Sequence, residues 1–354
     1  MGGTAPLTLR QHRPVVELGG LRALLDTAGS ALLVDQSVAN DLGLRTIETV
    51  EEGGQVFTVL EPPALEHLDT DGIPTYGFDD TRQLGMAAHG IDVVVPARVL
   101  QRHRVVLDPV DGVATFDGDE QPRGVRVPAD VDPATGLVRL TVLVAGEPLV
   151  LLLDTGVSCS LAADRVVQRW SARGWPTSAA SVGPANMAGL RMEARTPMVR
   201  APEVEVGQFT IPGVAFAWRG DGDVARIPGA PVDGSLGGSA IRAFRVELDA
   251  DHGTVWFEQR AAIAPVDEGD ADQVGVTLVL DDDGECEVGA TVSGLWPDVQ
   301  VGDRLVSVDG TTVSGRTLGE VLTMLAGPVG TRHHLVVRRG DDTVEADAPV
   351  VRVL

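Results

Sequence analysis

The stretch Leu151-Leu152-Leu153-Asp154-Thr155-Gly156 decides the fold, because an apolar run ends there abruptly in a carboxylate, a hydroxyl and a glycine. A short apolar run that stops at turn formers predicts a buried β-strand. A weaker copy, Leu24-Leu25-Asp26-Thr27-Ala28, lies upstream. Two carboxylates that share a proton can act together as general base and general acid, because one takes a proton while the other donates one. A single carboxylate cannot fill both roles at once. Asp26 and Asp154 are therefore the candidate catalytic residues.

The similarity between the two halves extends beyond these motifs. The segments 105–116 and 246–257 align with each other, and both predict a β-hairpin with an acidic, glycine-containing turn. A strand-turn-strand pattern precedes each motif, at 15–25 and at 140–153. We therefore expect a mainly β protein with two similar lobes.

The lobe boundaries follow from turn formers and charge. Residues 117–136 interrupt the strand pattern and predict a connector between the lobes, and 261–273 form a short acidic linker. The predicted domains are a first lobe over 10–118, a second lobe over 136–260 and a third domain over 273–354.

Composition excludes several classes of function. The net charge of −23 and the pI near 4.5 disfavour nucleic acid and anionic membranes as partners. On charge alone, basic peptides are the expected ligands. The chain contains no lysine, which excludes a Schiff-base lysine and a phosphate-loop lysine.

The cysteines and histidines indicate neither a disulfide framework nor a metal site. Cys159 and Cys286 fall in different predicted domains, so buried free thiols are expected, and no histidine motif for a metal occurs. No cofactor is expected. No apolar run has the length of a signal peptide core or a membrane span, so the sequence predicts a cytoplasmic protein, although a trimmed exported form would read the same way.

The third domain has a pattern of its own. The string Gly-Asp-Arg-Leu-Val-Ser-Val-Asp-Gly at 302–310 predicts a turn, a buried strand and a second turn. A helix is expected over 317–325, a Gly-Pro-Val-Gly-Thr stop follows at 327–331, and alternating strands are expected at 335–339 and 343–348. This run resembles a bacterial PDZ domain. The resemblance implies that protein C-termini bind as an added strand, with the carboxylate held by the loop Val274-Gly275-Val276.

With these motifs placed, the first two lobes resemble the two β-barrel lobes of retropepsin and pepsin-like aspartic proteases, fused in one chain. A second marker of that family is an apolar-apolar-glycine segment beneath each aspartate. Residues 233–238, Asp-Gly-Ser-Leu-Gly-Gly, fit it, whereas 92–97 depart, with Val93 in place of Gly234 and Pro96 in place of Gly237. Ala28 in place of glycine is a further departure.

The resemblance implies roles for the neighbouring residues. Thr27 and Thr155 would hydrogen-bond across the lobes, and Gly156 would allow a close approach. Ser30 and Ser158 would partly replace the serine that follows the motif in pepsins, and the dyad should favour mildly acidic to neutral pH. Hairpin flaps would close the cleft, with tips at Gly53-Gly54 and at Gly189.

Three hypotheses follow. The first is an endopeptidase in which Asp26 and Asp154 activate water against a peptide bond, with the PDZ domain recruiting or gating the substrate. The second is a pseudoprotease that binds peptides without cutting them. Ala28 and the segment Val-Val-Val-Pro at 93–96, which depart from the family pattern, are compatible with such a loss of catalysis. The third is a homodimer, rather than a monomer, in which two second lobes pair and Asp154 meets its own copy.

Overall fold

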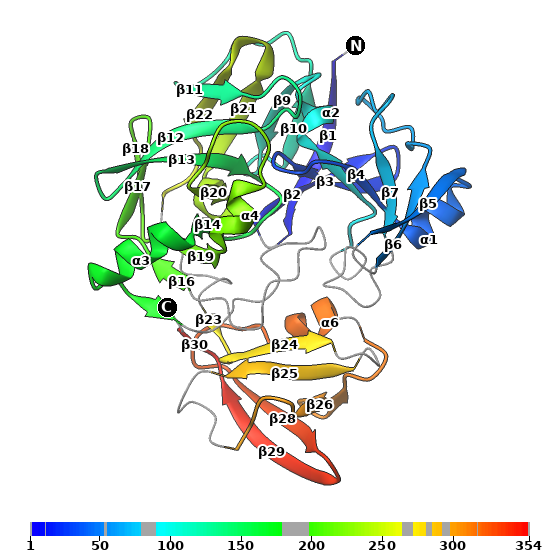
Figure 1. Cartoon of the computed structure of the whole chain (residues 1–354), viewed down its shortest axis with the longest axis vertical. Coiled ribbons are helices and arrows are strands. Elements are labelled where there is room, and N and C mark those ends of the chain that lie inside the picture. Colours follow the sequence, from blue (N-terminus) through cyan, green and yellow to red (C-terminus); the bar gives the residue numbers. More distant parts are fainter. Residues whose placement is uncertain are drawn as a thin grey trace.

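The structure is a computed structural model that describes residues 2–10, 12–52, 55–78, 90–178, 198–263, 272–280, 285–291, 298–316 and 318–352. It is mainly β, which confirms the predicted fold class. Two lobes built largely from strands lie together, and a smaller C-terminal module lies at the opposite end of the molecule (Figure 1).

In the first lobe the described elements alternate short strands with two short helices. In chain order they are β1 (Gly3–Arg10), β2 (Arg13–Leu18), β3 (Leu21–Asp26), β4 (Leu32–Asp35), α1 (Gln36–Asp41), β5 (Thr46–Glu52), β6 (Gln55–Leu60), β7 (Thr75–Phe78), β8 (Val93–Pro96), α2 (Ala97–Leu100), β9 (Arg104–Asp108) and β10 (Val113–Phe116).

The second lobe has a similar order and a larger number of described elements. They are β11 (Val125–Val131), β12 (Val138–Val144), β13 (Glu147–Asp154), β14 (Ser160–Ala163), α3 (Asp164–Ala172), β15 (Thr177–Ser178), β16 (Met198–Arg200), β17 (Glu203–Val206), β18 (Phe209–Pro212), β19 (Ala215–Arg219), α4 (Asp221–Ala225), β20 (Gly234–Gly237), α5 (Gly238–Ile241), β21 (Phe244–Asp249), η2 (Ala250–His252) and β22 (Thr254–Gln259).

The strand that carries each candidate aspartate has the same neighbours in both lobes. β3 runs parallel to β8, which is antiparallel to β4, and β4 is parallel to β7. β13, β20, β14 and β19 repeat these pairings. Asp26 is in register with Pro96 as Asp154 is with Gly237. The sequence predicted that Val93 is the first-lobe equivalent of Gly234 and that Pro96 is the equivalent of Gly237. The strand registers confirm both equivalences.

One sheet joins the lobes. Its strands follow the order β1, β10, β9, β21, β22 and β11, so that each lobe contributes its first strand and its last hairpin. The predicted hairpins at 105–116 and 246–257 are β9–β10 and β21–β22, and they meet where Leu107 pairs with Val246. Both strand-turn-strand predictions are also confirmed, as β2–β3 and β12–β13.

The structure corrects two details of the predicted lobe limits. Strand pairing begins at Gly3, opposite Phe116, rather than near residue 10. The region predicted as a connector, 117–136, contains β11, which pairs with both β22 and β12. The turn formers on either side of β11 obscured it, and it contains no buried apolar run, because only Val127 of its seven residues is buried.

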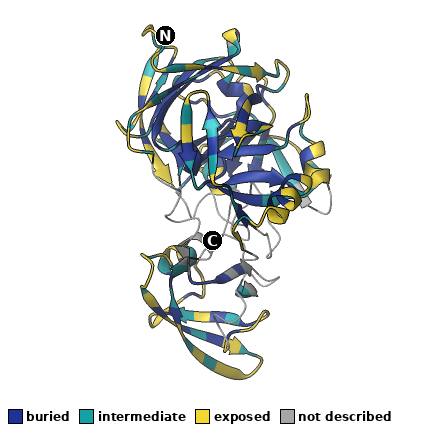
Figure 2. Ribbon diagram, turned by 90° about the vertical axis from the view of Figure 1, so that its left-hand side faces the viewer, coloured by how far each residue is buried: buried dark blue, intermediate teal, exposed yellow. Residues whose placement is uncertain are grey.

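The core explains why the aspartate strands are continuously apolar. Leu151, Leu152 and Leu153 are all buried, as are Leu24 and Leu25, because both faces of these strands are covered. Buried positions form one continuous core through both lobes, and Figure 2 shows them as the dark centre of that part of the molecule.

The C-terminal module is a separate small sheet with its own core. Its elements are β23 (Asp272–Gln273), β24 (Val276–Leu280), β25 (Cys286–Thr291), β26 (Arg304–Val308), β27 (Thr311–Thr312), α6 (Leu318–Met324), β28 (Arg332–Arg339), β29 (Asp342–Pro349) and β30 (Val351–Arg352). The predicted helix and the last two strands are confirmed as α6, β28 and β29. Buried Val276, Leu305 and Val321 pack together in this core.

Within the described residues, no helix is both long enough and apolar enough to cross a membrane. Cys159 and Cys286 are buried thiols, as expected.

Candidate active site

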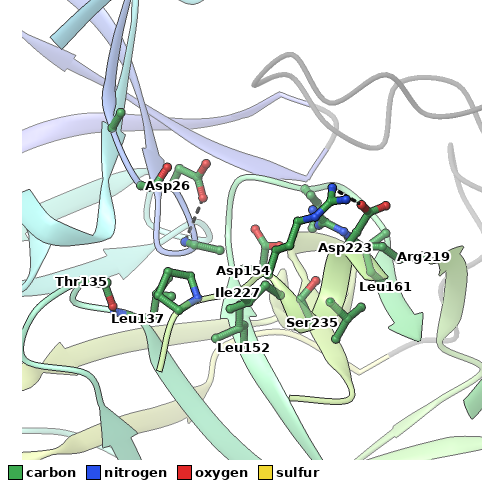
Figure 3. A pocket seen from close by; sticks show the side chains of 18 of the residues that line it. Asp26, Thr135, Leu137, Leu152, Asp154, Leu161, Arg219, Asp223, Ile227 and Ser235 are labelled. Carbon is green, nitrogen blue, oxygen red and sulfur yellow. Dashed lines mark hydrogen bonds and ion pairs between the residues drawn. The ribbon is translucent and has the colours of Figure 1, made fainter. Parts of the chain in front are cut away.

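A cavity of about 480 Å³ lies between the lobes and contains both candidate aspartates. Asp26 and Asp154 lie in its wall, with apolar side chains from each lobe around them (Figure 3). Both carboxyl groups are about 95% buried, each being 5% exposed. The sequence therefore predicted correctly that the two motifs meet, although they are far apart in the chain.

A matching pair of acidic residues fixes the strand before each motif. The backbone N–H of Arg22 donates to Asp92 Oδ2 at 2.8 Å, and the backbone N–H of Val150 donates to Asp233 Oδ2 at 3.0 Å. Each donor lies four residues before its candidate aspartate, and each acceptor opens the segment that threads beneath it. These bonds place both aspartates at equivalent positions in their lobes.

The two threonines brace the lobes against each other. The Thr27 N–H donates to Thr155 Oγ1 at 3.1 Å, and the Thr155 N–H donates to Thr27 Oγ1 at 3.0 Å. Each hydroxyl then donates across the interface, that of Thr27 to the Leu153 carbonyl and that of Thr155 to the Leu25 carbonyl. Both side chains are buried, so every donor and acceptor of this cross-brace depends on the opposite lobe.

Gly156 lies directly against Asp26. A Cβ atom added at Gly156 would overlap the carboxyl group of Asp26, while the Gly156 N–H donates to Asp154 Oδ1 at 3.2 Å. Both carboxyl groups therefore converge on one glycine. Only a residue without a side chain fits between them, which is the close approach that the resemblance implied.

Burial and mutual repulsion disfavour ionisation of the pair. Loss of solvation, and then the charge of Asp154, raise the pKa of Asp26 to about 7. Burial also raises the pKa of Asp154, but the Ser235 hydroxyl and the charge of Arg219 oppose this rise. Because the two groups are coupled, they share one proton rather than both ionising, and the Ser235 hydroxyl and the Arg219 charge favour the negative charge on the Asp154 side.

Ser235 and Arg219 are the neighbours that sequence reasoning missed. Ser235 stands in the quoted segment 233–238, where its buried hydroxyl beside Asp154 could have been noticed, although it makes no well-aligned hydrogen bond there. Arg219 follows an ordinary strand, and no motif marks it.

The departures of the first lobe form a consistent alternative packing. In the second lobe the Gly237 N–H donates to Ser160 Oγ at 3.1 Å. Pro96 has no N–H, and the position that matches Ser160 is Leu32, which is fully buried. Donor and acceptor are thus both absent from the first lobe, so Pro96 leaves no polar group unsatisfied.

Ala28 also keeps the local geometry. Its N–H donates to Asp26 Oδ1 at 2.9 Å, just as Gly156 donates to Asp154, and Ala28 lines the cavity. The methyl group therefore occupies part of the cavity rather than breaking the turn.

The predicted serine substitutes do not hold the dyad. Ser30 is exposed at the cavity wall and Ser158 is buried, but neither hydroxyl forms a hydrogen bond with Asp26 or Asp154 in the described structure.

The predicted flap tips lie outside the described residues. Gly53 and Gly54 lie between β5 and β6, which form the expected antiparallel hairpin. Gly189 lies between β15 and β16, which also pair antiparallel. In the C-terminal module, Val274 and Val276 are buried, and Gly275 has a φ of +74°, a conformation that favours glycine.

Comparison with known proteins agrees with these observations. Residues 140–240 match the aspartyl protease family model, and residues 298–339 match the PDZ domain model. The chain carries an aspartyl protease domain and a C-terminal PDZ domain. The match to the aspartyl protease model lies within the second lobe, and the first lobe repeats the strand pairings of that lobe.

One solved structure, the photosystem II D1 C-terminal processing protease, is 23% identical over 24% of each chain, with a TM-score of 0.23. No curated protein matches the chain. Across the part of the chain that the structure describes, no group of acidic, histidine and cysteine residues could hold a metal ion.

Proposed function

We propose that the protein is an aspartic endopeptidase whose dyad, Asp26 and Asp154, is completed within one chain. The observation that carries this proposal is the Thr27–Thr155 cross-brace, which fixes two buried carboxyl groups on either side of Gly156. A purely structural role would not require two carboxyl groups to be buried beside each other, an arrangement that costs stability.

The reaction uses the single proton that the two groups share. Ionised Asp154 takes a proton from water, whose oxygen attacks the peptide carbonyl carbon, while protonated Asp26 donates to the carbonyl oxygen. A proton then passes to the peptide nitrogen as the carbon–nitrogen bond breaks. The products are one carboxyl and one amino terminus, and the dyad regains its single proton.

The PDZ domain supports a role in recruiting or gating the substrate. Gly275 and its buried valine neighbours open β24, and α6 packs beside the same strand. This is the arrangement in which a peptide C-terminus adds a strand.

The test compares wild type with Asp26→Asn and Asp154→Asn on a broad peptide library from about pH 4 to 8, the range in which one shared proton is expected. Loss of cleavage in both variants, by about a hundred- to ten-thousandfold, supports the proposal. Activity that survives Asp26→Asn and rises with protein concentration would indicate a dyad assembled from two chains. Binding without cleavage in the wild type would indicate a pseudoprotease.

A further inference from the structure

The cavity differs in charge from the protein around it. Among the described residues, three arginines line it, Arg98, Arg219 and Arg226, whereas Asp223 is the single acidic residue besides the dyad. When the dyad carries one negative charge, the described cavity wall is net positive, although the whole chain has a charge of −23. A charge in a partly desolvated wall outweighs distant surface charges that salt screens.

Among the three cations, Arg219 is the one placed to meet a bound group. Arg226 pairs with Asp223 at 3.2 Å and its side chain is 82% exposed, and Arg98 is exposed on the first lobe. Arg219 is half-buried at the end of β19, next to Ala163 of β14. Its guanidinium makes no hydrogen bond or ion pair with any other residue that the structure describes.

The surroundings of Arg219 strengthen any such contact. Figure 3 shows Arg219 and Ser235 on the Asp154 side of the cavity, away from Asp26. Much of the adjoining wall is apolar, formed by Leu152, Val157, Leu161, Val224 and Ile227. A planar guanidinium in apolar surroundings binds a carboxylate through two parallel hydrogen bonds, which are worth more there than in water.

We propose that Arg219 is a specificity-determining residue that selects peptides with a carboxylate close to the scissile bond, on the second-lobe side of the cavity. This inference rests on the proposed function and names its substrate class. It reverses the expectation of basic peptides drawn from the net charge, because the wall of the cavity decides recognition at short range.

Arg219 has a second effect that a merely structural residue would not have. Its charge faces Asp154 and lowers the pKa of that group, together with Ser235, whereas buried Arg13 acts on Asp26. Removing the Arg219 charge should therefore move the acidic limb of the pH–activity profile to higher pH. A substrate carboxylate bound to Arg219 would weaken this effect, so acidic substrates should shift the limb in the same direction.

The experiment uses the full chain and peptides with amidated C-termini that carry one Glu, Gln or Lys at each of four positions on either side of the cleaved bond. Wild type is compared with Arg219→Gln, Arg219→Lys and the control Arg123→Gln, whose exposed side chain pairs with Glu120 outside the cavity. A parallel arm with free C-termini distinguishes a terminal carboxylate from a side-chain carboxylate. Binding of uncleavable reduced-bond peptides is measured alongside cleavage.

We expect wild type to prefer Glu over Gln about tenfold or more at one position, mainly through KM, and Arg219→Gln to lose that preference. Arg219→Lys should restore part of it, and Arg123→Gln should leave it unchanged. A Glu preference that persists in Arg219→Gln, or cleavage that is indifferent to substrate charge, overturns the inference. If nothing is cleaved but Glu peptides bind through Arg219, the selectivity stands and the proposed catalysis fails. If neither cleavage nor charge-selective binding occurs, both fail.

Discussion

Corresponding strands position the candidate aspartate in each lobe, but different residues pack around the turn that follows it. The second lobe uses Gly156 and the Gly237–Ser160 hydrogen bond, whereas the first uses Ala28 and the apolar pair of Leu32 and Pro96. The backbone pairings are the same in both. A carboxyl group can therefore be held in position by strand pairing, while the residues packed around the turn vary as long as donors and acceptors are removed together.

The strongest test of this comparison exchanges the residue that follows each Asp-Thr. Gly156→Ala should reduce cleavage by about a thousandfold, because its methyl group would displace the Asp26 carboxyl group from the shared proton. Steady-state kinetics on the best library peptide would measure the loss.

Ala28→Gly is the matched control, because it removes a methyl group from the cavity wall. It should keep activity and cost about 1 kcal/mol of stability. Equal losses in both variants would contradict the view that the first lobe tolerates this residue.

The next largest effect should come from the cross-brace. Thr155→Val removes the acceptor of the buried Thr27 N–H and the donor to the Leu25 carbonyl, so the free energy of unfolding should fall by about 2–4 kcal/mol. Thr27→Val should cost a similar amount, because the bonds are reciprocal. Urea unfolding measures both values, and a difference of more than about 2 kcal/mol between them would show that the lobes do not depend on each other equally.

The aspartates should differ in their effect on stability as a function of pH. The pKa of Asp26 is about 7 in the folded protein and near its ordinary value when unfolded, so the folded state binds the proton more tightly. The contribution of Asp26 to the free energy of unfolding is therefore fully present at low pH and declines as the pH rises toward 7.

Asp26→Asn should consequently raise the melting temperature by several degrees at pH 8 and by little at pH 4. Thermal unfolding at the two pH values, with Asp154→Asn for comparison, checks this expectation. A pH-independent change would contradict the raised pKa. In the wild type, cleavage should decline above pH 7 as Asp26 loses its proton.

The smallest effect concerns the hydroxyl that the first lobe lacks. Ser160→Ala leaves the buried Gly237 N–H without its acceptor and should cost about 1–3 kcal/mol. Gly237→Pro would remove that N–H, but its Cβ would overlap the Cys159 carbonyl. If Ser160→Ala has no effect, the Leu32–Pro96 pairing does not explain why the first lobe needs no hydroxyl.

Local patterns in the sequence predicted much of this structure, and contacts between distant segments account for what they missed. The internal repeat predicted both lobes and the two hairpins, because apolar runs and turn residues act locally, and the resemblance to aspartic proteases implied that Asp26 meets Asp154. Strand β11 was missed because it contains no buried apolar run, and Arg219 was missed because a lining residue is defined only by the folded cavity. Ser30 and Ser158 were predicted to support the dyad because of their positions in the sequence. Whether a hydroxyl reaches a carboxyl group depends on the direction of the side chain, which the sequence does not give.

The sheet that joins the lobes also sets the order in which the chain can fold. The first strand of each lobe pairs with the last hairpin of the same lobe, Gly3 with Phe116 and Val125 with Phe257. During synthesis the first lobe therefore cannot close until Phe116 has left the ribosome, and its β9 edge stays unpaired until β21 follows. Because these contacts span long segments, folding should be slow, and the unpaired β9 edge is the part of the nascent protein that most needs protection from aggregation.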